Sequence, residues 1–551
     1  MKKALSIILV FSLLISISAC SQKTTEVNDI TAANTAAADS ATQKNDSVSE
    51  DPSDIKETEA PLVEPAEPIK EWDGTFKSLQ LLNQRNYQYY WGKSERSIID
   101  VHYPDITLDE VGKTHFPELE KSLEKMDDDI ENSVLGTLDE LKSGAEKEYN
   151  EAASEFGDAV LENFSVFANK YDAYVTRADS NAVSILMKHE SYAGEPDVSI
   201  DFNAYNFDTQ SGKELKLKDV VSDTAAFAKL VKEFIQTYYP DKSLFEKTNM
   251  DDLLGYKYSW VMTNEGVTMY YRPGDIDSYQ DGYITATVTY KGHEDLFNKK
   301  YTQCVENYFQ ELVENAPNYF DVDGDGRYER ILSYQMIDDS TRIATTMITV
   351  DDATEQNETE SHSLRTFIVK NDGKVYAHQF MTLNTNYPYT RIYELTSGKP
   401  VSHSEGYYWL ANKFDEARKA MEMIPSDAAN IKLAMKMWLL GTYQAIKNYH
   451  IDDKGILTSE EPWYEIAGAP PITFIRGMEF DVVNEKGEVI GKRKAHVADK
   501  LNLYRTDYDN FIDGKFDDGT IIRMNVELGD SQFYVNGVSE KELFDGIVYT
   551  D

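Results

Sequence analysis

The chain has 551 residues, with 96 Asp or Glu against 55 Lys or Arg and a formal net charge of −41. A protein with this much negative charge repels nucleic acid and anionic lipid, and attracts cations and basic proteins. We therefore expect no nucleic-acid partner. There are only two cysteines, Cys20 and Cys304.

Residues 1–19 have the pattern of a bacterial lipoprotein signal peptide. A short basic start, Lys2-Lys3, precedes an apolar run, Ala4 to Ile17, that is too short for a stable transmembrane span. The run ends in Ile17-Ser18-Ala19-Cys20, which resembles a lipobox. The pattern predicts cleavage before Cys20, lipidation of that residue and a membrane anchor on the extracytoplasmic face. An ordinary secretory signal with a chance cysteine is the alternative.

Residues 20–70 are rich in Ala, Thr, Ser, Asp and Glu and contain almost no large apolar side chains. Such a segment buries too little apolar surface to offset the entropy of ordering. We predict a disordered acidic linker.

Residues 71–299 predict an α+β domain. A strand at Ile98–Tyr103 precedes a long helix that begins at Pro117 and carries apolar residues every three or four positions to Phe156. Three strands follow between 173 and 204. Ser222 or Asp223 then caps a helix that ends before Pro240. A hairpin between 258 and 271, and a strand over 283–290, complete the domain.

Residues 90–292 resemble the RsiV-type extracytoplasmic domain, which also forms the N-terminal half of the peptidoglycan deacetylase PdaC. The resemblance is carried by Tyr205–Val220, by Trp260, by Tyr279-Gln280-Asp281-Gly282 and by Val101-His102-Tyr103-Pro104 before the long helix. It implies an α+β domain outside the cytoplasmic membrane of a Gram-positive bacterium. In RsiV such a domain binds the cationic protein lysozyme. The sigma-binding segment and membrane span of RsiV have no counterpart here, so the resemblance does not extend to an anti-sigma role.

Residues 300–410 are predicted to be β-rich around an acidic loop, D-x-D-G-D-G-x-x-E, at 321–329. Carboxylates at alternate positions can surround one hard cation, and oxygen ligands favour Ca²⁺. The predicted ligands are Asp321, Asp323, Asp325, the carbonyl of Arg327 and Glu329. The alternative is an acidic turn without a metal. Position 332 is Leu, and a strand follows, so the loop is not an EF-hand.

The other elements of this region are less regular. We predict strands over 342–350, 366–370, 375–381 and 387–393, with a turn at Asn371-Asp372-Gly373 and a polar excursion over 352–360. Cys304, Tyr308 and Leu312 have helical spacing.

Residues 411–551 are predicted to be mostly β. A short helix is expected over 414–423 and a strand over 439–449. The short strands after Ile472 suggest a small SH3-like barrel.

Candidate catalytic residues are few. Phe516-Asp517-Asp518-Gly519 matches part of a polysaccharide deacetylase metal motif, but those enzymes also need an H-[ST]-x-x-H pair, and none of the nine histidines forms one. The tetrapeptide is better explained as a hairpin turn. We therefore expect no enzymatic activity.

The predicted function is a non-catalytic lipoprotein that binds an extracellular or cell-envelope ligand, and the favoured ligand is a basic protein such as lysozyme. A lipoprotein that binds peptidoglycan or another cell-wall glycan is an alternative, and an envelope hydrolase of unrecognised type is another. The oligomeric state does not follow from the sequence.

Overall fold

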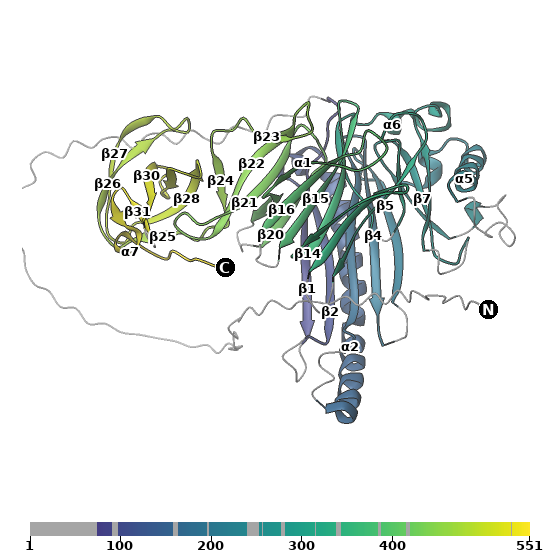
Figure 1. Ribbon diagram of the computed structural model, residues 1–551, viewed down its shortest axis with the longest axis horizontal. Helices are drawn as coiled ribbons and strands as arrows, with labels where there is room; N and C mark the ends of the chain where they lie inside the picture. Colours follow the sequence, from purple (N-terminus) through teal and green to yellow (C-terminus); the bar gives the residue numbers. More distant parts are fainter. Residues whose placement is uncertain are drawn as a thin grey trace, which may run out of the picture. The chain divides into compact units, whose positions relative to one another are not determined.

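The computed structural model describes residues 74–90, 97–157, 164–194, 198–239, 253–255, 257–276, 282–314, 316–337, 343–383, 387–414, 419–529 and 532–550. The predicted signal peptide, Cys20 and the predicted linker lie outside these residues. The described part is α+β, as predicted: a long helix packs on a sheet in the N-terminal part, and strands dominate the rest (Figure 1).

The N-terminal sheet has the strand order β19-β20-β1-β2-β3-β4-β5. Strands β2 and β3 are parallel, because the helices α1 and α2 cross between them, and the other pairs are antiparallel. The elements are β1 (Leu81–Tyr90), β2 (Ile99–Leu108), α1 (Glu110–His115), α2 (Pro117–Phe156), β3 (Phe167–Ala178), β4 (Ala182–Tyr192), β5 (Ser199–Asp208), β19 (Asn412–Phe414) and β20 (Ala420–Ile424).

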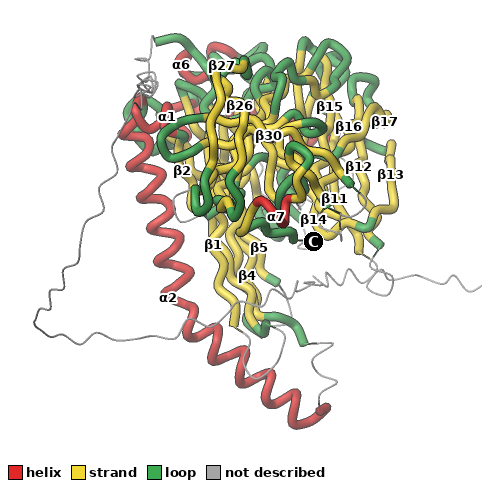
Figure 2. Tube along the Cα trace, turned by 90° about the vertical axis from the view of Figure 1, so that its left-hand side faces the viewer, coloured by secondary structure: helices red, strands yellow, loops and turns green. Residues whose placement is uncertain are grey.

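Helix α2 confirms the predicted long helix, with Pro117 in its first turn. Its apolar stripe packs on the N-terminal sheet, and the stripe residues from Leu119 to Val134 are buried at 0–3 % exposure. The second half is less covered: Leu138 and Leu141 are only partly buried. Figure 2 shows α2 running along β1 and β2 and continuing past their ends.

Carboxylates of α2 also hold the backbone of β2. Asp127 Oδ2 accepts a hydrogen bond from the Ile106 amide at 2.7 Å, and Glu120 Oε2 accepts one from the Leu108 amide at 2.9 Å. Both carboxylate side chains are buried. The helix is therefore fixed to β2 by hydrogen bonds from its side chains to the strand backbone as well as by apolar packing.

A second sheet, β6-β7-β8, packs with helix α5 around its own apolar core. Asp223 is the N-cap of α5 and accepts from the amides of Ala225 and Ala226, as the sequence predicts. The elements are α4 (Leu217–Val220), α5 (Thr224–Tyr238), the 3-10 helix η3 (Leu253–Gly255), β6 (Tyr258–Met262), β7 (Gly266–Tyr271), β8 (Ile284–Thr289), the 3-10 helix η5 (Glu294–Leu296) and α6 (Lys299–Thr302).

Two further sheets follow, with the orders β10-β11-β12-β13 and β17-β16-β15-β14-β9. The turn at Asn371–Gly373 is confirmed, with Asp372 and Gly373 both at positive φ. The strands are β9 (Tyr308–Glu311), β10 (Asn318–Phe320), β11 (Glu329–Ile337), β12 (Ala344–Val350), β13 (Ala353–Thr359), β14 (Ser361–Asn371), β15 (Lys374–Leu383), β16 (Pro388–Glu394) and β17 (Val401–Gly406).

Three sequence expectations are wrong. The polar excursion over 352–360 contains strand β13, which pairs with β12 at the edge of its sheet and so needs no apolar face. The helix expected over 414–423 is replaced at its two ends by β19 and β20, because β20 pairs with β1. The helical spacing of Cys304, Tyr308 and Leu312 is coincidental, since Tyr308 begins strand β9.

The C-terminal strands belong to one 14-stranded sheet. Strands after Ile472 pack around an apolar core, and β28 pairs with β24, so they continue the strands β21 and β22. The SH3-like topology stays a prediction. The elements are β18 (Trp409–Leu410), β21 (Ile431–Met437), β22 (Tyr443–Ile451), β23 (Leu457–Thr458), β24 (Tyr464–Ala467), β25 (Ile472–Phe474), β26 (Met478–Val483), β27 (Val489–Ala495), β28 (Lys500–Thr506), β29 (Phe511–Lys515), β30 (Ile521–Leu528), β31 (Phe533–Val535), β32 (Val538–Ser539), α7 (Glu540–Leu543) and β33 (Phe544–Asp545).

Among the residues that the structure describes, no helix combines the length and the apolar character needed to cross a membrane.

Candidate metal site and acidic surface

The acidic loop lies between β10 and β11 and brings three of its predicted ligands together. One carboxylate oxygen from each of Asp321, Asp323 and Asp325 lies within 4.8 Å of the others. The local spacing produces this arrangement, because Gly324 and Gly326 adopt φ of 78° and 88° and turn the backbone tightly. Three carboxylates at this separation repel one another and would attract a cation.

Hydrogen bonds within the loop use some of these oxygens. The Asp325 amide donates to Asp323 Oδ1 at 3.1 Å, the Gly326 amide to Asp321 Oδ2 at 3.2 Å, and the Arg327 amide to Asp325 Oδ1 at 2.7 Å. The other oxygen of Asp321, Oδ1, is buried and has no hydrogen-bond partner. A buried carboxylate oxygen without a donor fits a cation ligand, so the residues present are compatible with Ca²⁺.

Glu329 lies behind the loop. It is 7 % exposed, its Oε2 accepts from the Val322 amide at 2.9 Å, and it does not belong to the cluster of three aspartates. Burial raises the pKa of Glu329, and the negative charges of Asp323 and Asp351 add to the effect. Its hydrogen bond with the Val322 amide stabilises the loop. The ligand roles predicted for Glu329 and for the Arg327 carbonyl stay predictions.

The loop is supported by helix α5, which is distant in sequence. The amide of Tyr328 donates to the Tyr238 hydroxyl at 2.8 Å. The rings of Phe234, Tyr238, Tyr319 and Tyr328 contact one another at centroid distances of 4.4 to 6.0 Å. This aromatic cluster fixes the position of the strand that follows the loop.

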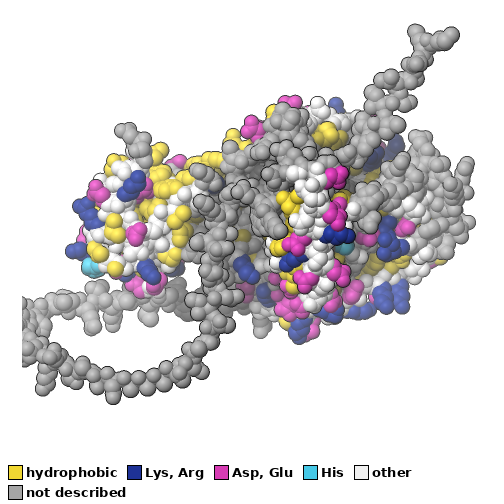
Figure 3. All heavy atoms as spheres, turned by 90° about the horizontal axis from the view of Figure 1, so that it is seen from below, with side chains coloured by type: hydrophobic (Ala, Val, Ile, Leu, Met, Phe, Trp, Pro, Cys, Tyr) yellow, Lys and Arg dark blue, Asp and Glu magenta, His cyan; other side chains and the backbone are white. Residues whose placement is uncertain are grey.

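A second candidate surface is the outer face of α2. The helix contains thirteen Asp or Glu and four Lys or Arg. Lys121 pairs with Glu118, and Lys125 pairs with Asp129. The other exposed carboxylates are those of Glu124, Asp128, Asp139, Glu140, Glu148, Glu151 and Glu155. Figure 3, which looks from below toward the lower end of α2, shows many carboxylates to the right of the centre of the view.

The tetrapeptide that resembles part of a deacetylase motif is a turn. Strands β29 and β30 pair on either side of it, and the Phe516 amide bonds to the Thr520 carbonyl at 2.9 Å. Nearby, the buried Asp513 accepts hydrogen bonds from Arg505 and Arg523. This group holds strands together and was not predicted from the sequence.

Sequence reasoning also missed β1. Its segment from Asn83 to Tyr90 contains amides, one arginine and three tyrosines, and it has no apolar alternation to mark a strand. The available signal was weaker: Arg85, Tyr87 and Tyr89 alternate with amide side chains, as expected for a strand that is polar on both faces.

Comparison with known proteins gives weak structural similarity only. No family model matches the chain, and no curated protein matches it. Two similar solved structures belong to the DUF3298 family. One, from Bacteroides fragilis NCTC 9343, has a TM-score of 0.28 and 15 % identity, over 41 % of this chain and 93 % of that chain. The other, from Pseudomonas aeruginosa PAO1, has a TM-score of 0.26 and 13 % identity, over 41 % of this chain and 95 % of that chain.

Proposed function

We propose that this chain is a non-catalytic binding protein of the cell envelope. Lipid on Cys20 holds it to the extracytoplasmic face of the cell membrane, and its ligand is a basic protein such as lysozyme. The observation that carries the proposal is the charge of α2, where exposed carboxylates outnumber exposed cations along a helix of 40 residues.

The attraction between α2 and a basic protein is electrostatic. A surface with many like charges raises the association rate and affinity of an oppositely charged protein, and added salt weakens both. Asp139, Glu140 and Glu151 lie on the half of α2 whose apolar residues are less covered, so a partner can reach them. The resemblance of residues 90–292 to the RsiV-type domain supports a partner of this kind.

Calcium has a structural role in this proposal. Asp321, Asp323 and Asp325 would hold the ion and relieve their mutual repulsion, which would fix the connection between β10 and β11. This role is independent of ligand binding by α2.

The test measures binding of hen lysozyme to the chain from residue 21 onward, at low and at physiological ionic strength. We expect saturable binding that weakens with salt. The double variant Asp139→Asn, Glu140→Gln should bind about fivefold less tightly, because each exposed pair contributes up to about 1 kcal/mol.

A matched control removes the same charge elsewhere. Glu355 and Glu358 are exposed on the edge strand β13, and Glu355→Gln, Glu358→Gln should leave lysozyme binding nearly unchanged. No binding at low ionic strength would refute the choice of a basic protein. Equal weakening by both double variants would show that net charge, and not α2, attracts the partner.

A further inference from the structure

Strand β1 is paired along its whole length on one side only. It pairs with β2 from Leu81 to Tyr90, but with β20 only from Leu81 to Asn83. The residues of β20 that precede Glu422, Ala420 and Met421, pair with β19 and not with β1. From Gln84 onward, the edge of β1 has no partner among the described strands.

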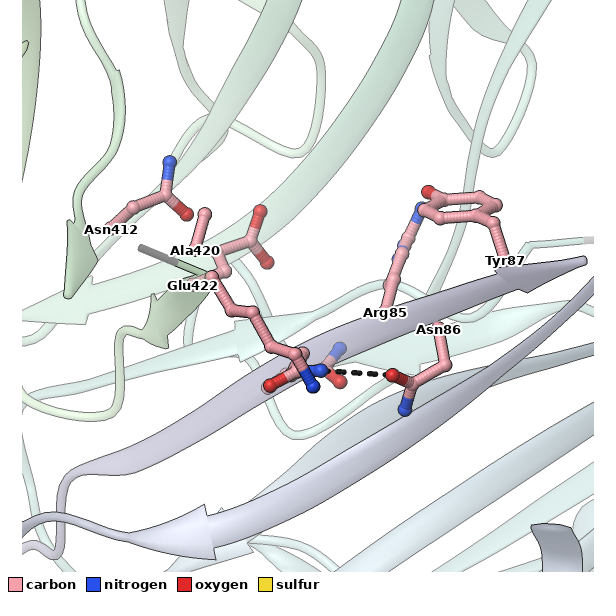
Figure 4. A pocket seen from close by; sticks show the side chains of 9 residues that line it. Arg85, Asn86, Tyr87, Asn412, Ala420 and Glu422 are labelled. Carbon is pink, nitrogen blue, oxygen red and sulfur yellow. Dashed lines mark hydrogen bonds between the residues drawn. The ribbon is translucent and has the colours of Figure 1, made fainter. Parts of the chain in front are cut away.

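A hollow of about 460 Å³ occupies the space where β20 and β1 diverge. Figure 4 shows Arg85 and Tyr87 projecting from one side of β1, with Asn412, Ala420 and Glu422 across from them. The full lining is Asn83, Gln84, Arg85, Asn86, Tyr87, Asn412, Lys419, Ala420 and Glu422. A hollow of this size is in the range of sites for small ligands.

Asn83 lines the hollow and carries an acceptor that lacks a donor. Asn83 is 4 % exposed, and its Oδ1 is buried without a hydrogen-bond partner. Beside it, Gln84 Nε2 donates to Asn86 Oδ1 at 2.8 Å, which orients these two amides. Burying an unpaired polar atom is unfavourable. A ligand O–H or N–H that reaches Asn83 Oδ1 would remove this cost.

Three charged side chains line the hollow: Arg85 and Glu422 form ion pairs with other residues of the protein, and Lys419 is exposed. Arg85 forms an ion pair with Asp172 at 3.6 Å. Glu422 is bound by Arg365, which also forms two hydrogen bonds of 2.6 Å with Glu311. The remaining chemistry is dominated by amide donors and acceptors, which suits an uncharged polar ligand better than an ion.

Aromatic rings project from the same side of β1 as Asn83, whereas Gln84 and Asn86 project from the other side. Tyr87 and Tyr89 are 47 % and 50 % exposed, and their rings are nearly parallel, with an interplanar angle of 8° and centroids 5.8 Å apart. They project from the same side of β1 as Arg85, as the period of a strand requires. An exposed ring face binds the apolar C–H face of a sugar ring, and neighbouring amides bind its hydroxyl and acetamido groups.

We propose that this hollow binds a neutral oligosaccharide of N-acetylated amino sugars. An extended peptide that added to the edge of β1 would use the strand backbone, and would need neither the Asn83 acceptor nor the tyrosine ring faces. An acetylated sugar uses both the Asn83 acceptor and the tyrosine ring faces, because it offers hydroxyl and amide donors as well as an apolar face. The site is separate from the α2 surface proposed above.

The test is calorimetric titration of the chain from residue 21 onward with triacetylchitotriose, and with cellotriose as a sugar lacking acetamido groups. We expect saturable binding of triacetylchitotriose with a Kd on the order of 1 mM or tighter, and weaker binding of cellotriose. Tyr87→Ala should weaken binding about tenfold or more. Tyr407→Ala is the control, because Tyr407 is 58 % exposed and does not line the hollow.

Three results would overturn the proposal. They are the absence of binding by either sugar, equal affinity in Tyr87→Ala and in the original chain, and capture of an unfolded polypeptide, reduced carboxymethylated lactalbumin, without sugar binding. The last result would identify a strand-adding site. Tyr89→Ala provides a second exposed substitution if Tyr87→Ala fails to fold. Lysozyme binding by Tyr87→Ala should be unchanged, so failure of this proposal is distinguishable from failure of the function proposed for α2.

Discussion

Asp127 makes the stability of the N-terminal domain depend on pH. The residue is 8 % exposed, Oδ2 accepts from the Ile106 amide, and Oδ1 is buried without a hydrogen-bond partner. Burial raises the pKa of Asp127 from 3.8 to about 9, against the lowering effect of the Ile106 amide. The carboxyl is therefore protonated at neutral pH. Asp127→Asn retains an oxygen acceptor for Ile106 and removes the ionisation.

The sign of the effect follows from proton binding. The folded chain keeps a proton on Asp127 that the unfolded chain releases above pH 3.8, so this contribution to stability is complete below pH 3.8 and is lost as pH rises toward 9. The slope is at most about 1.4 kcal/mol per pH unit. Between pH 5 and pH 8 we expect the free energy of unfolding of Asp127→Asn to rise by roughly 2 to 4 kcal/mol relative to that of the original chain. The lower value applies if the folded protein relaxes around the ionised carboxylate.

The assay is calorimetric unfolding of the original chain, Asp127→Asn and Asp128→Asn at pH 5, 6, 7 and 8. Asp128 is exposed on the same helix, so its substitution removes a similar charge without changing a buried group. We expect the melting temperatures of the original chain and Asp128→Asn to fall together with pH, while Asp127→Asn falls less. Parallel curves for all three would refute the assignment of a buried proton to Asp127.

Three other predictions concern the acidic loop at 321–329, the turn at Gly212 and the thiol of Cys304. Calcium at a hundredfold its Kd adds about 2.7 kcal/mol to the stability of the folded state, so EDTA should lower the melting temperature of the chain, and Asp321→Asn, Asp325→Asn should abolish the response. An unchanged transition, with no calcium by elemental analysis, would identify an acidic turn. Gly212 has φ of +65°, and a Cβ there would lie 2.2 Å from a backbone oxygen of α2. Gly212→Ala should therefore cost about 1–3 kcal/mol more in urea unfolding than Gly282→Ala, which meets no atom within 4 Å; equal costs would contradict the close contact. Burial raises the pKa of the Cys304 thiol to about 11, so iodoacetamide at pH 8 should modify the folded chain about a hundredfold more slowly than the chain in guanidinium chloride, and equal rates would show an accessible thiolate.

The sequence by itself determined elements whose signals are local. The Pro117 start and the apolar stripe specify α2, because residues three or four apart share one helix face. The acidic loop could also be predicted from local sequence, because the carboxylates that meet are only two residues apart and Gly324 and Gly326 allow the tight turn. The turn at Asn371–Gly373 needs only the positive φ that its residues adopt easily.

Tertiary structure alone decided the elements that are stabilised by distant partners. Strand β1 has no apolar period, yet it forms because β2 and β20 satisfy its backbone, and Leu81 pairs with Ile424 far along the chain. The same pairing makes 420–424 a strand where the local pattern favours a helix. The hollow beside β1 exists only because the part of β20 before Glu422 does not pair with β1. Pairing with a distant strand imposes no periodic pattern on the residues of either segment. The sequence therefore contained no local signal that predicts this site.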